Sequence, residues 1–332
     1  MNPHAPHSFR RAPGLLVRAL LACALCAGAT AADLTPKARP AVRAEHATRA
    51  KLLAAERAGQ RIVAVGDHGV VLLSDDEGRS WRQAQAVPVD AQLNALSFAD
   101  ARQGWAVGHW GVVLRTEDGG ETWALQRQAT QEDRPLFGVH FFDAQHGVAV
   151  GLWSLVLVTA DGGRTWTPGV VPVPPGARKA DLNLYGLFAT ARGELVATSE
   201  RGTLLHSSDR GQSWSYIATG YRGSFWTGAG LADGSVLVAG LRGTIYRSPN
   251  GQDAWTKVES GTSASIPALK VAPGSGADRI VAVAVDGTVL RSADGGASFQ
   301  PEAGRAGAPA LTALVFGSGG QAVLLSREGP RK

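Results

Sequence analysis

One block of about 18 residues occurs six times along this chain, and this repetition limits the possible folds more than any other feature. The first copy reads AVGDHGVVLLSDDEGRSW from Ala64, and the second reads AVGHWGVVLRTEDGGETW from Ala106. The later copies begin at Ala149, Ala197, Val238 and Ala282. The residues that close successive copies are 41 to 48 positions apart. A repeat of this length indicates an array of similar structural units rather than a set of unrelated domains.

Each copy predicts two short strands joined by turns. Its second half follows the pattern S/T-x-D-x-G-x-x-W, in which aspartate can bond turn amides and glycine permits a positive φ. The aspartates of the matching copies are Asp76, Asp118, Asp161, Asp209 and Asp294. The aromatic residues that close the copies, and that we expect between sheets, are Trp81, Trp123, Trp166, Trp214, Trp255 and Phe299. The copy that ends at Trp255 is degenerate, with Asn250 in place of the aspartate.

An apolar segment precedes each block and another short strand follows it, so the unit is four strands in about 43 residues. This is the size of one blade of a β-propeller. Residues 311–329 align without gaps to 184–202 and cover only the first two strands of a further blade. We therefore expect an all-β, seven-bladed propeller of four-stranded blades, in which residues 38–46 close the last blade as its outer strand. Six blades with a loose tail are the alternative.

The first 32 residues are typical of a secretory signal peptide. Residues 1–18 are basic, residues 19–27 are apolar, and small residues follow at 29–31. The apolar run is too short for an ordinary transmembrane helix. Both cysteines, Cys23 and Cys26, lie in this segment, so no disulfide would hold the mature chain together.

The expected domain organisation follows from this interpretation. Residues 1–32 form the signal peptide, 33–47 an N-terminal segment with the possible closing strand, and 48–332 the propeller. We expect a periplasmic protein. An outer-envelope lipoprotein anchored through Cys23, or a secreted protein, is the alternative.

The charge of the chain argues against a nucleic-acid partner. The formal net charge is +5, but Arg10, Arg11 and Arg18 contribute three of these charges within a segment that contains no acid. The +2 that remains is not the surplus that nucleic-acid binding usually requires. An exported protein is also separated from most nucleic acid.

The repeated motif is the Asp-box, or BNR repeat, first associated with bacterial sialidases. Its presence in nearly every blade of an exported chain resembles the photosystem II stability/assembly-factor family and its bacterial relatives. Residues 221–226 (YRGSFW) and 240–248 (GLRGTIYRS) also fit that family. The resemblance covers roughly residues 48–329 and implies a non-catalytic propeller that assists the assembly of a membrane protein complex.

The sequence shows no active site of the sialidase kind. Such a site needs three arginines around a carboxylate, a tyrosine with a partner glutamate, and an acid/base aspartate. The Arg-Ile-Pro signature is absent, because Ser265 precedes Ile266-Pro267, and no glutamate accompanies Tyr221. The eight histidines show no metal-ligand spacing. We therefore expect no enzymatic activity, no metal and no cofactor.

Candidate binding residues gather on one face of the expected propeller. The turns between the second and third strands share this face with the links between blades, whereas the Asp-box turns lie on the opposite face. At one equivalent turn position, successive blades carry His68, Trp110, Trp153, Arg201, Arg242 and Asp286. The links between blades add Arg134, Tyr221 and Arg222. Tryptophan and arginine dominate interface hot spots, so we predict that all of these except Asp286 form a partner-binding face.

Three functions compete for this face. A monomer that binds a protein partner, expected to be an envelope or membrane protein complex, requires only a continuous exposed patch. A sialidase-like protein that binds or hydrolyses glycans could stack sugars on Trp110 and Trp153, but requires three arginines converging on a pocket with a Tyr/Glu pair. The third alternative is a purely structural propeller within a larger envelope assembly. We favour the protein-binding hypothesis because no pocket-forming acid pair accompanies the tryptophans.

Overall fold

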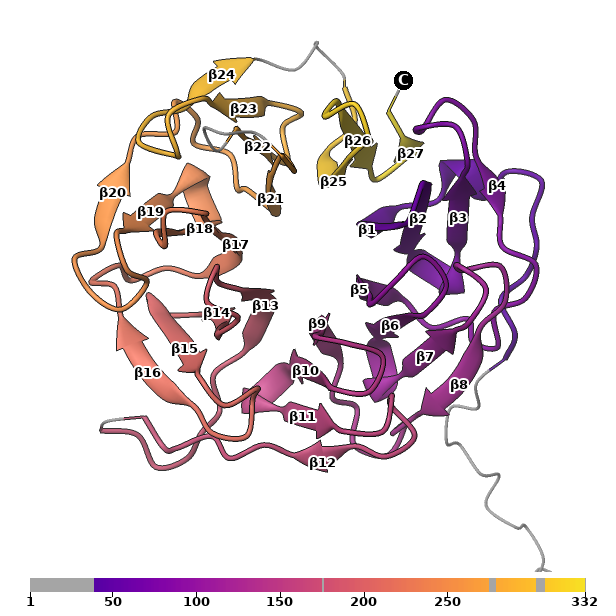
Figure 1. Cartoon of the computed structure of the whole chain (residues 1–332), viewed down its shortest axis with the longest axis horizontal. Helices are drawn as coiled ribbons and strands as arrows, with labels where there is room; N and C mark the ends of the chain where they lie inside the picture. Colours follow the sequence, from indigo (N-terminus) through magenta and orange to yellow (C-terminus); the bar gives the residue numbers. More distant parts are fainter. Residues whose placement is uncertain (1–38, 175, 275–278, 303–307, 332) are drawn as a thin grey trace, which may run out of the picture. The chain divides into compact units, whose positions relative to one another are not determined.

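The computed structural model describes residues 39–174, 176–274, 279–302 and 308–331. The predicted signal peptide lies outside these residues. Residues Lys37–Lys332 form one compact unit. Seven antiparallel sheets are arranged around a central axis in this unit, and the chain passes from one sheet to the next in sequence order (Figure 1). The seven-bladed fold is confirmed, so the six-bladed alternative is wrong.

Six sheets have four strands and the last has three. The first contains β1 (Leu52–Ala58), β2 (Arg61–Gly66), β3 (Val71–Ser74) and β4 (Arg82–Gln83). The second contains β5 (Leu93–Phe98), β6 (Gly104–Gly108), β7 (Val113–Thr116) and β8 (Ala124–Arg127). The third contains β9 (Leu136–Phe141), β10 (Gly147–Gly151), β11 (Val156–Thr159) and β12 (Thr167–Pro168). The fourth contains β13 (Leu184–Ala189), β14 (Leu195–Ser199), β15 (Thr203–Ser207) and β16 (Ser215–Ala218).

The remaining sheets complete the ring. The fifth contains β17 (Phe225–Gly230), β18 (Val236–Gly240), β19 (Ile245–Ser248) and β20 (Thr256–Val258). The sixth contains β21 (Ala268–Val271), β22 (Ile280–Val283), β23 (Val289–Ser292) and β24 (Gln300–Glu302). The seventh contains β25 (Leu311–Phe316), β26 (Ala322–Ser326) and β27 (Gly329–Pro330). Short 3-10 turns are η1 (Ala47–Arg49), η2 (Asp67–Gly69), η3 (His109–Gly111), η4 (Leu152–Ser154) and η5 (Leu241–Gly243).

The hydrophobic core lies between neighbouring sheets. The second strands β6, β10, β14 and β18 are buried at every residue, because a sheet is covered on both faces by its neighbours. Seven apolar clusters fill the spaces between sheets. The closing Trp123, for example, comes from the second blade and packs with Val63 and Leu73 of the first. The repeat therefore supplies the same interblade contact again and again.

The Asp-box turns are held by one repeated set of hydrogen bonds. In the first box, the Asp76 carboxylate accepts from the Ser80 backbone N–H at 2.8 Å and the Ser80 hydroxyl at 2.6 Å. The Ser74 hydroxyl donates to Asp76 and accepts from the Gly78 N–H, and the Trp81 indole donates to the Gly78 carbonyl at 3.0 Å. The same carboxylate contacts occur at Asp118, Asp161, Asp209 and Asp294. Each aspartate therefore pins the tip of a turn.

The degenerate box keeps its shape by other means. The Asn250 side-chain oxygen accepts from the N–H groups of Gln252 and Asp253, and the Ser248 hydroxyl donates to the Asp253 carbonyl at 2.5 Å. The indole N–H of Trp255 has no partner among the described residues. A turn of similar outline thus forms without the aspartate.

The seventh sheet differs from expectation. Of the segment expected to provide its outer strand, residues 39–46 are described and form no strand. They lie against the first blade instead, where the Ala41 N–H donates to the Val87 carbonyl at 2.9 Å. The physical reason is that β27, formed by the chain's own return at Gly329, already pairs with β26. The free edge is thus occupied from within the blade.

Apolar packing joins the seventh sheet to the first. Val315 and Leu325 share a buried cluster with Leu52 and Ile62. The Thr312 hydroxyl donates to the Leu52 carbonyl at 2.5 Å, and Glu77 accepts the Ser318 N–H at 2.8 Å. These contacts close the ring between segments that are far apart in the chain.

Acid unfolding tests the Asp-box hydrogen bonds. Bonds from Ser80, Thr165 and Ser298 hold the pKa values of Asp76, Asp161 and Asp294 at about 2. An unfolded aspartate has a pKa near ~3.9. The unfolded chain therefore binds protons first, and this contribution to stability is complete above about pH 5 and falls as the pH drops from ~4 to ~2.

We expect the triple substitution Asp76→Asn, Asp161→Asn and Asp294→Asn to flatten the pH dependence of the free energy of unfolding in this range. Urea titrations between pH 5 and pH 2 measure it, and each single substitution should remove part of the slope. An unchanged slope in the triple variant would show that these carboxylates do not contribute.

Substitution of a buried and of an exposed tryptophan tests how much the packing between blades contributes to stability. Trp123 is 6% exposed in the core, whereas Trp153 is 51% exposed on a turn. We expect Trp123→Ala to lower the free energy of unfolding by about 3–5 kcal/mol, because it leaves a cavity and a carbonyl without its donor. Trp153→Ala should change it by less than about 0.5 kcal/mol. Equal losses in urea denaturation would contradict this assignment of the core.

Candidate functional site

The turns between second and third strands share an uncommon backbone conformation. His68, Trp110, Trp153, Arg201 and Arg242 have φ values of 53° to 59°, in the left-handed region that favours glycine. A large side chain at such a position is therefore an unusual choice. Asp286, the expected equivalent in the sixth blade, is not among the described residues with positive φ.

Exposure divides these turn residues. His68, Trp153, Arg201 and Arg242 are exposed, and so is Arg222 in the link between the fourth and fifth blades. Trp110 is half-buried against the core cluster that contains Trp123, and its carbonyl accepts from the Ala129 N–H at 2.7 Å. Trp110 therefore offers less surface than Trp153.

Two of the predicted contact residues donate hydrogen bonds to the backbone of the turns. The Arg134 guanidinium donates to the Trp153 carbonyl at 3.0 Å. The Tyr221 hydroxyl donates to the Leu241 carbonyl at 3.3 Å and accepts from the Thr244 hydroxyl at 3.2 Å. Arg134 therefore stabilises η4, which carries Trp153, and Tyr221 stabilises η5, which carries Arg242.

Three exposed arginines gather on one sector of the face. The link 219–224, which carries Arg222, joins the turn that follows Arg201, because the Gly202 N–H donates to the Gly223 carbonyl at 2.7 Å. It joins η5 on its other side, because the Leu241 N–H donates to the Ser224 carbonyl at 3.0 Å. Backbone hydrogen bonds thus hold the loops of Arg201, Arg222 and Arg242 side by side.

No ion pair neutralises this cluster within the part of the chain that the structure describes. The ion pairs formed there by Arg61, Arg82, Arg247 and other cations leave out Arg201, Arg222 and Arg242. Three unpaired guanidinium groups on adjacent loops repel one another and attract anions, and each can bind a carboxylate through two hydrogen bonds. We call Arg201, Arg222 and Arg242 the arginine cluster.

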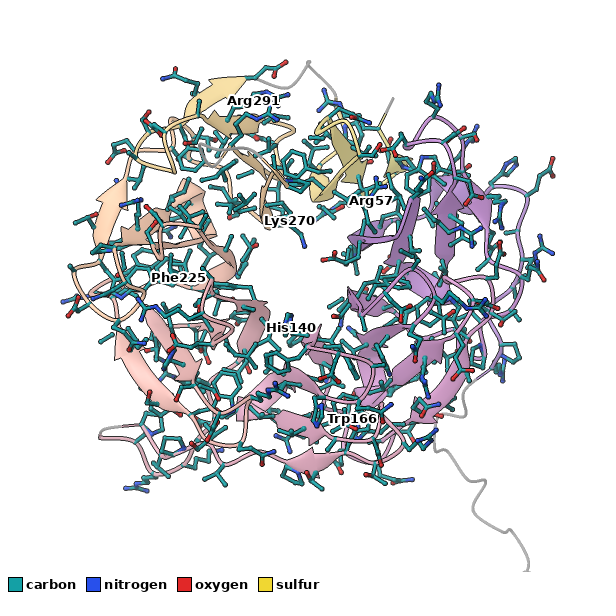
Figure 2. All side chains as sticks on the ribbon, viewed as in Figure 1. Arg57, His140, Trp166, Phe225, Lys270 and Arg291 are labelled. Carbon is teal, nitrogen blue, oxygen red and sulfur yellow. The ribbon has the colours of Figure 1, made fainter. Side chains whose placement is uncertain are left out.

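A cavity of about 300 Å³ lies among the inner strands β1, β5, β9, β13, β17, β21 and β25. Lys270 forms an ion pair with Glu56 at 2.6 Å, and Figure 2 shows Lys270 and His140 at the inner rim of the ring. Burial lowers the pKa of His140, so its imidazole is neutral at pH 7. Glu56 is the only carboxylate among the described residues that line the cavity.

The cavity therefore lacks the parts of a glycosidase site. Glycoside hydrolysis uses two carboxyl groups on either side of the scissile bond, and the second is missing from the described lining. The described residues also contain no group of three or more His, Cys, Asp or Glu side chains placed to hold a metal ion. Within the same residues, no helix has the length and apolar character that a membrane crossing requires.

The lining residues that were not identified from the sequence include three aromatic residues at equivalent places: Phe137, Tyr185 and Trp226. Each is the second residue of an inner strand. Alignment of the repeats places these three residues at one position. The usual alternation of side chains along a strand, however, does not reveal that they are skipped in the pairing with the next strand. The available signal was three aromatic residues at the same position in consecutive blades.

Comparison with known proteins agrees with the fold and the motif. A family model described as "Photosynthesis system II assembly factor YCF48" matches residues 83–269. No curated protein sequence gives a significant match.

Solved structures show the same fold. A structure described as "YCF48 bound to D1 peptide" is 20% identical, has a TM-score of 0.69, and aligns over 85% of this chain and 92% of its own. YCF48 from Cyanidioschyzon merolae is 18% identical, has a TM-score of 0.68, and aligns over 85% of this chain and 94% of its own. A GH74 xyloglucanase from Xanthomonas campestris is 16% identical, has a TM-score of 0.66, and aligns over 89% of this chain but 53% of its own.

At such identities, the structural matches support the architecture alone. The family match rests on the sequence and spans more than half of the chain, from the end of the first blade into the sixth. It agrees with the Asp-boxes and with the segments 221–226 and 240–248. The protein is therefore a member of the YCF48 family of photosystem II assembly factor propellers.

Proposed function

We propose that this protein is an exported, non-catalytic factor that binds a protein partner and assists the assembly of an envelope or membrane protein complex. The observation that carries the proposal is the arginine cluster, three exposed cations without ion-pair partners in the described structure. Its partner surface is accordingly acidic. The periplasm, or the outer envelope, is the compartment that the proposed signal peptide implies.

Membership of the family supports a peptide or protein as the partner. A relative was solved as YCF48 bound to a D1 peptide, which shows that a propeller of this family accepts a peptide. Arginine suits that role because its planar guanidinium binds carboxylates in two-pronged geometry. The host of this chain need not be photosynthetic for such a role.

The proposed contacts have different roles. Arg201, Arg222 and Arg242 bind acidic groups directly, and the exposed indole of Trp153 supplies apolar area beside them. His68 and Trp110 extend the face toward the first two blades. Arg134 and Tyr221 act as positioning residues, because their polar groups are directed at the carbonyls of the neighbouring turns.

A glycan-binding or glycan-cleaving role is the weaker candidate. The exposed Trp153 favours it, because its indole could stack on a sugar. Cleavage lacks support because Glu56 is alone among the described lining carboxylates and is paired with Lys270. Tyr221, the candidate nucleophile for sialidase chemistry, instead bonds a backbone carbonyl and Thr244.

Proximity crosslinking in the native host tests the proposal. The tagged wild type is compared with the double variant Arg222→Ala and Arg242→Ala, each checked for folding. We expect the variant to lose at least about tenfold in capture of the membrane or envelope protein, since hot-spot arginines contribute about 2 kcal/mol each and 1.4 kcal/mol is tenfold.

A matched control removes the same charge from the opposite face. Arg164 lies in an Asp-box turn and Arg192 in the hairpin between β13 and β14, and both are exposed. The double variant Arg164→Ala and Arg192→Ala should capture the partner like the wild type. Equal capture by both double variants would contradict the arginine cluster as the binding site.

A further inference from the structure

The inner strands of six blades contain a bulge at the same place. In β1, β5, β9, β13, β17 and β25, the pairing with the second strand skips the second residue. The skipped residues are Leu53, Asn94, Phe137, Tyr185, Trp226 and Thr312. A bulged residue leaves the ladder, its side chain is redirected, and such positions are common beside functional sites.

The bulges of the third, fourth and fifth blades carry aromatic rings. Phe137, Tyr185 and Trp226 are half-buried, line the central cavity, and belong to none of the seven interblade core clusters. The rings of Phe137 and Tyr185 are 6.1 Å apart between centroids. Aromatic side chains carry the largest apolar area of any residues, so leaving three of them outside the core forgoes considerable stabilisation. We call these three residues the aromatic arc.

The rest of this ring of positions is less aromatic. Asn94 donates to the Leu136 carbonyl at 2.8 Å and accepts from Gln92. Leu53 is aliphatic, and Thr312 is buried with its hydroxyl bonded to the Leu52 carbonyl. The aromatic arc is therefore confined to the third, fourth and fifth blades.

The aromatic arc adjoins the arginine cluster. The inner strands begin on the face where the links between blades arrive, and Trp226 follows Arg222 by four residues, which limits their Cα separation to about 14 Å. Asn183 ties the two features together on the neighbouring blade. Its side chain accepts from the Trp153 N–H at 3.3 Å and donates to the Tyr185 hydroxyl at 3.5 Å, and its N–H donates to Glu200, which precedes Arg201.

We propose that the aromatic arc receives an aromatic side chain from an acidic peptide segment whose carboxylates bind the arginine cluster. This inference rests on the proposed function and adds the chemistry of the ligand. Charge complementarity selects an acidic chain, and the aromatic arc offers edge-to-face and stacked contacts. A cavity of about 300 Å³ is at the small end of ligand pockets and suits one large side chain rather than a folded surface.

Fluorescence anisotropy with two synthetic peptides tests the inference. The probes are labelled acidic octapeptides that differ only at one central position, Phe in one and Ala in the other. The purified protein should bind the Phe peptide at least about tenfold more tightly, since burial of one aromatic side chain supplies that difference. Trp226→Ala should abolish the preference, and Leu125→Ala, which removes an exposed apolar side chain on the outer strand β8, should retain it. Phe137→Ala serves as a second variant in case Trp226→Ala does not fold.

The outcomes separate this inference from the proposed function. Equal binding of both peptides, weakened by Arg222→Ala with Arg242→Ala, would overturn the aromatic arc as the side-chain site while supporting the arginine cluster. Binding of neither peptide would also overturn it, and the crosslinking comparison alone would then decide the proposed function. Oligosaccharide binding on a glycan array that is lost in Trp226→Ala would assign the arc to a sugar and overturn the peptide.

Discussion

Apolar packing between neighbouring sheets is the contact on which the rest of this propeller depends. The second strands of the second to sixth blades are covered on both sides, so their residues are buried without alternation, as β6 and β10 show. In the five boxes that keep the aspartate, the closing aromatic residue reaches into this layer while the aspartate fixes the turn outside it. Because the same packing recurs, the seventh blade can be completed by three strands and still close the ring against Leu52 and Ile62.

The two faces of the propeller therefore differ in how far their side chains can vary. The Asp-box face repeats the same bonds, since each aspartate, serine or threonine, and glycine has a defined partner in its turn. The opposite face carries the turns between second and third strands, whose backbone bonds to the links do not specify side chains. Large residues such as Trp153 and Arg242 can therefore occupy left-handed positions there, and function can vary without altering the core.

Much of the fold was predictable from the sequence because the repeat encodes it locally. The spacing of the closing aromatic residues gave the blade size, and the partial copy at 311–329 indicated the seventh blade. The closing strand was not predictable in the same way: whether residues 39–46 or Gly329 and Pro330 pair with β26 depends on tertiary competition between two short segments.

The grouping of the candidate residues on one face was predictable for similar reasons, whereas their role in binding stays a prediction. The turn positions share one face, so His68, Trp153 and Arg242 could be assigned to it from topology. The hydrogen bonds of Arg134 and Tyr221 could not be predicted, because their partners are backbone carbonyls of turns elsewhere in the sequence. The bulge at Trp226 was equally hidden, since a bulge changes pairing without changing residue type.

Two groups of exposed arginines differ in their ion pairing, and this difference supports the proposed binding face. On the outer rim, Arg82 donates to both Asp75 and Glu121, and these acids also pair with Arg61. Exposed ion pairs contribute little to stability, so their absence from the arginine cluster costs the fold little. Arg201, Arg222 and Arg242 stay hydrated in the free protein, and in the proposed complex carboxylates of the partner would replace that water. In that complex the aromatic arc would also remove apolar surface of the same ligand from water, which unpaired charge alone does not achieve.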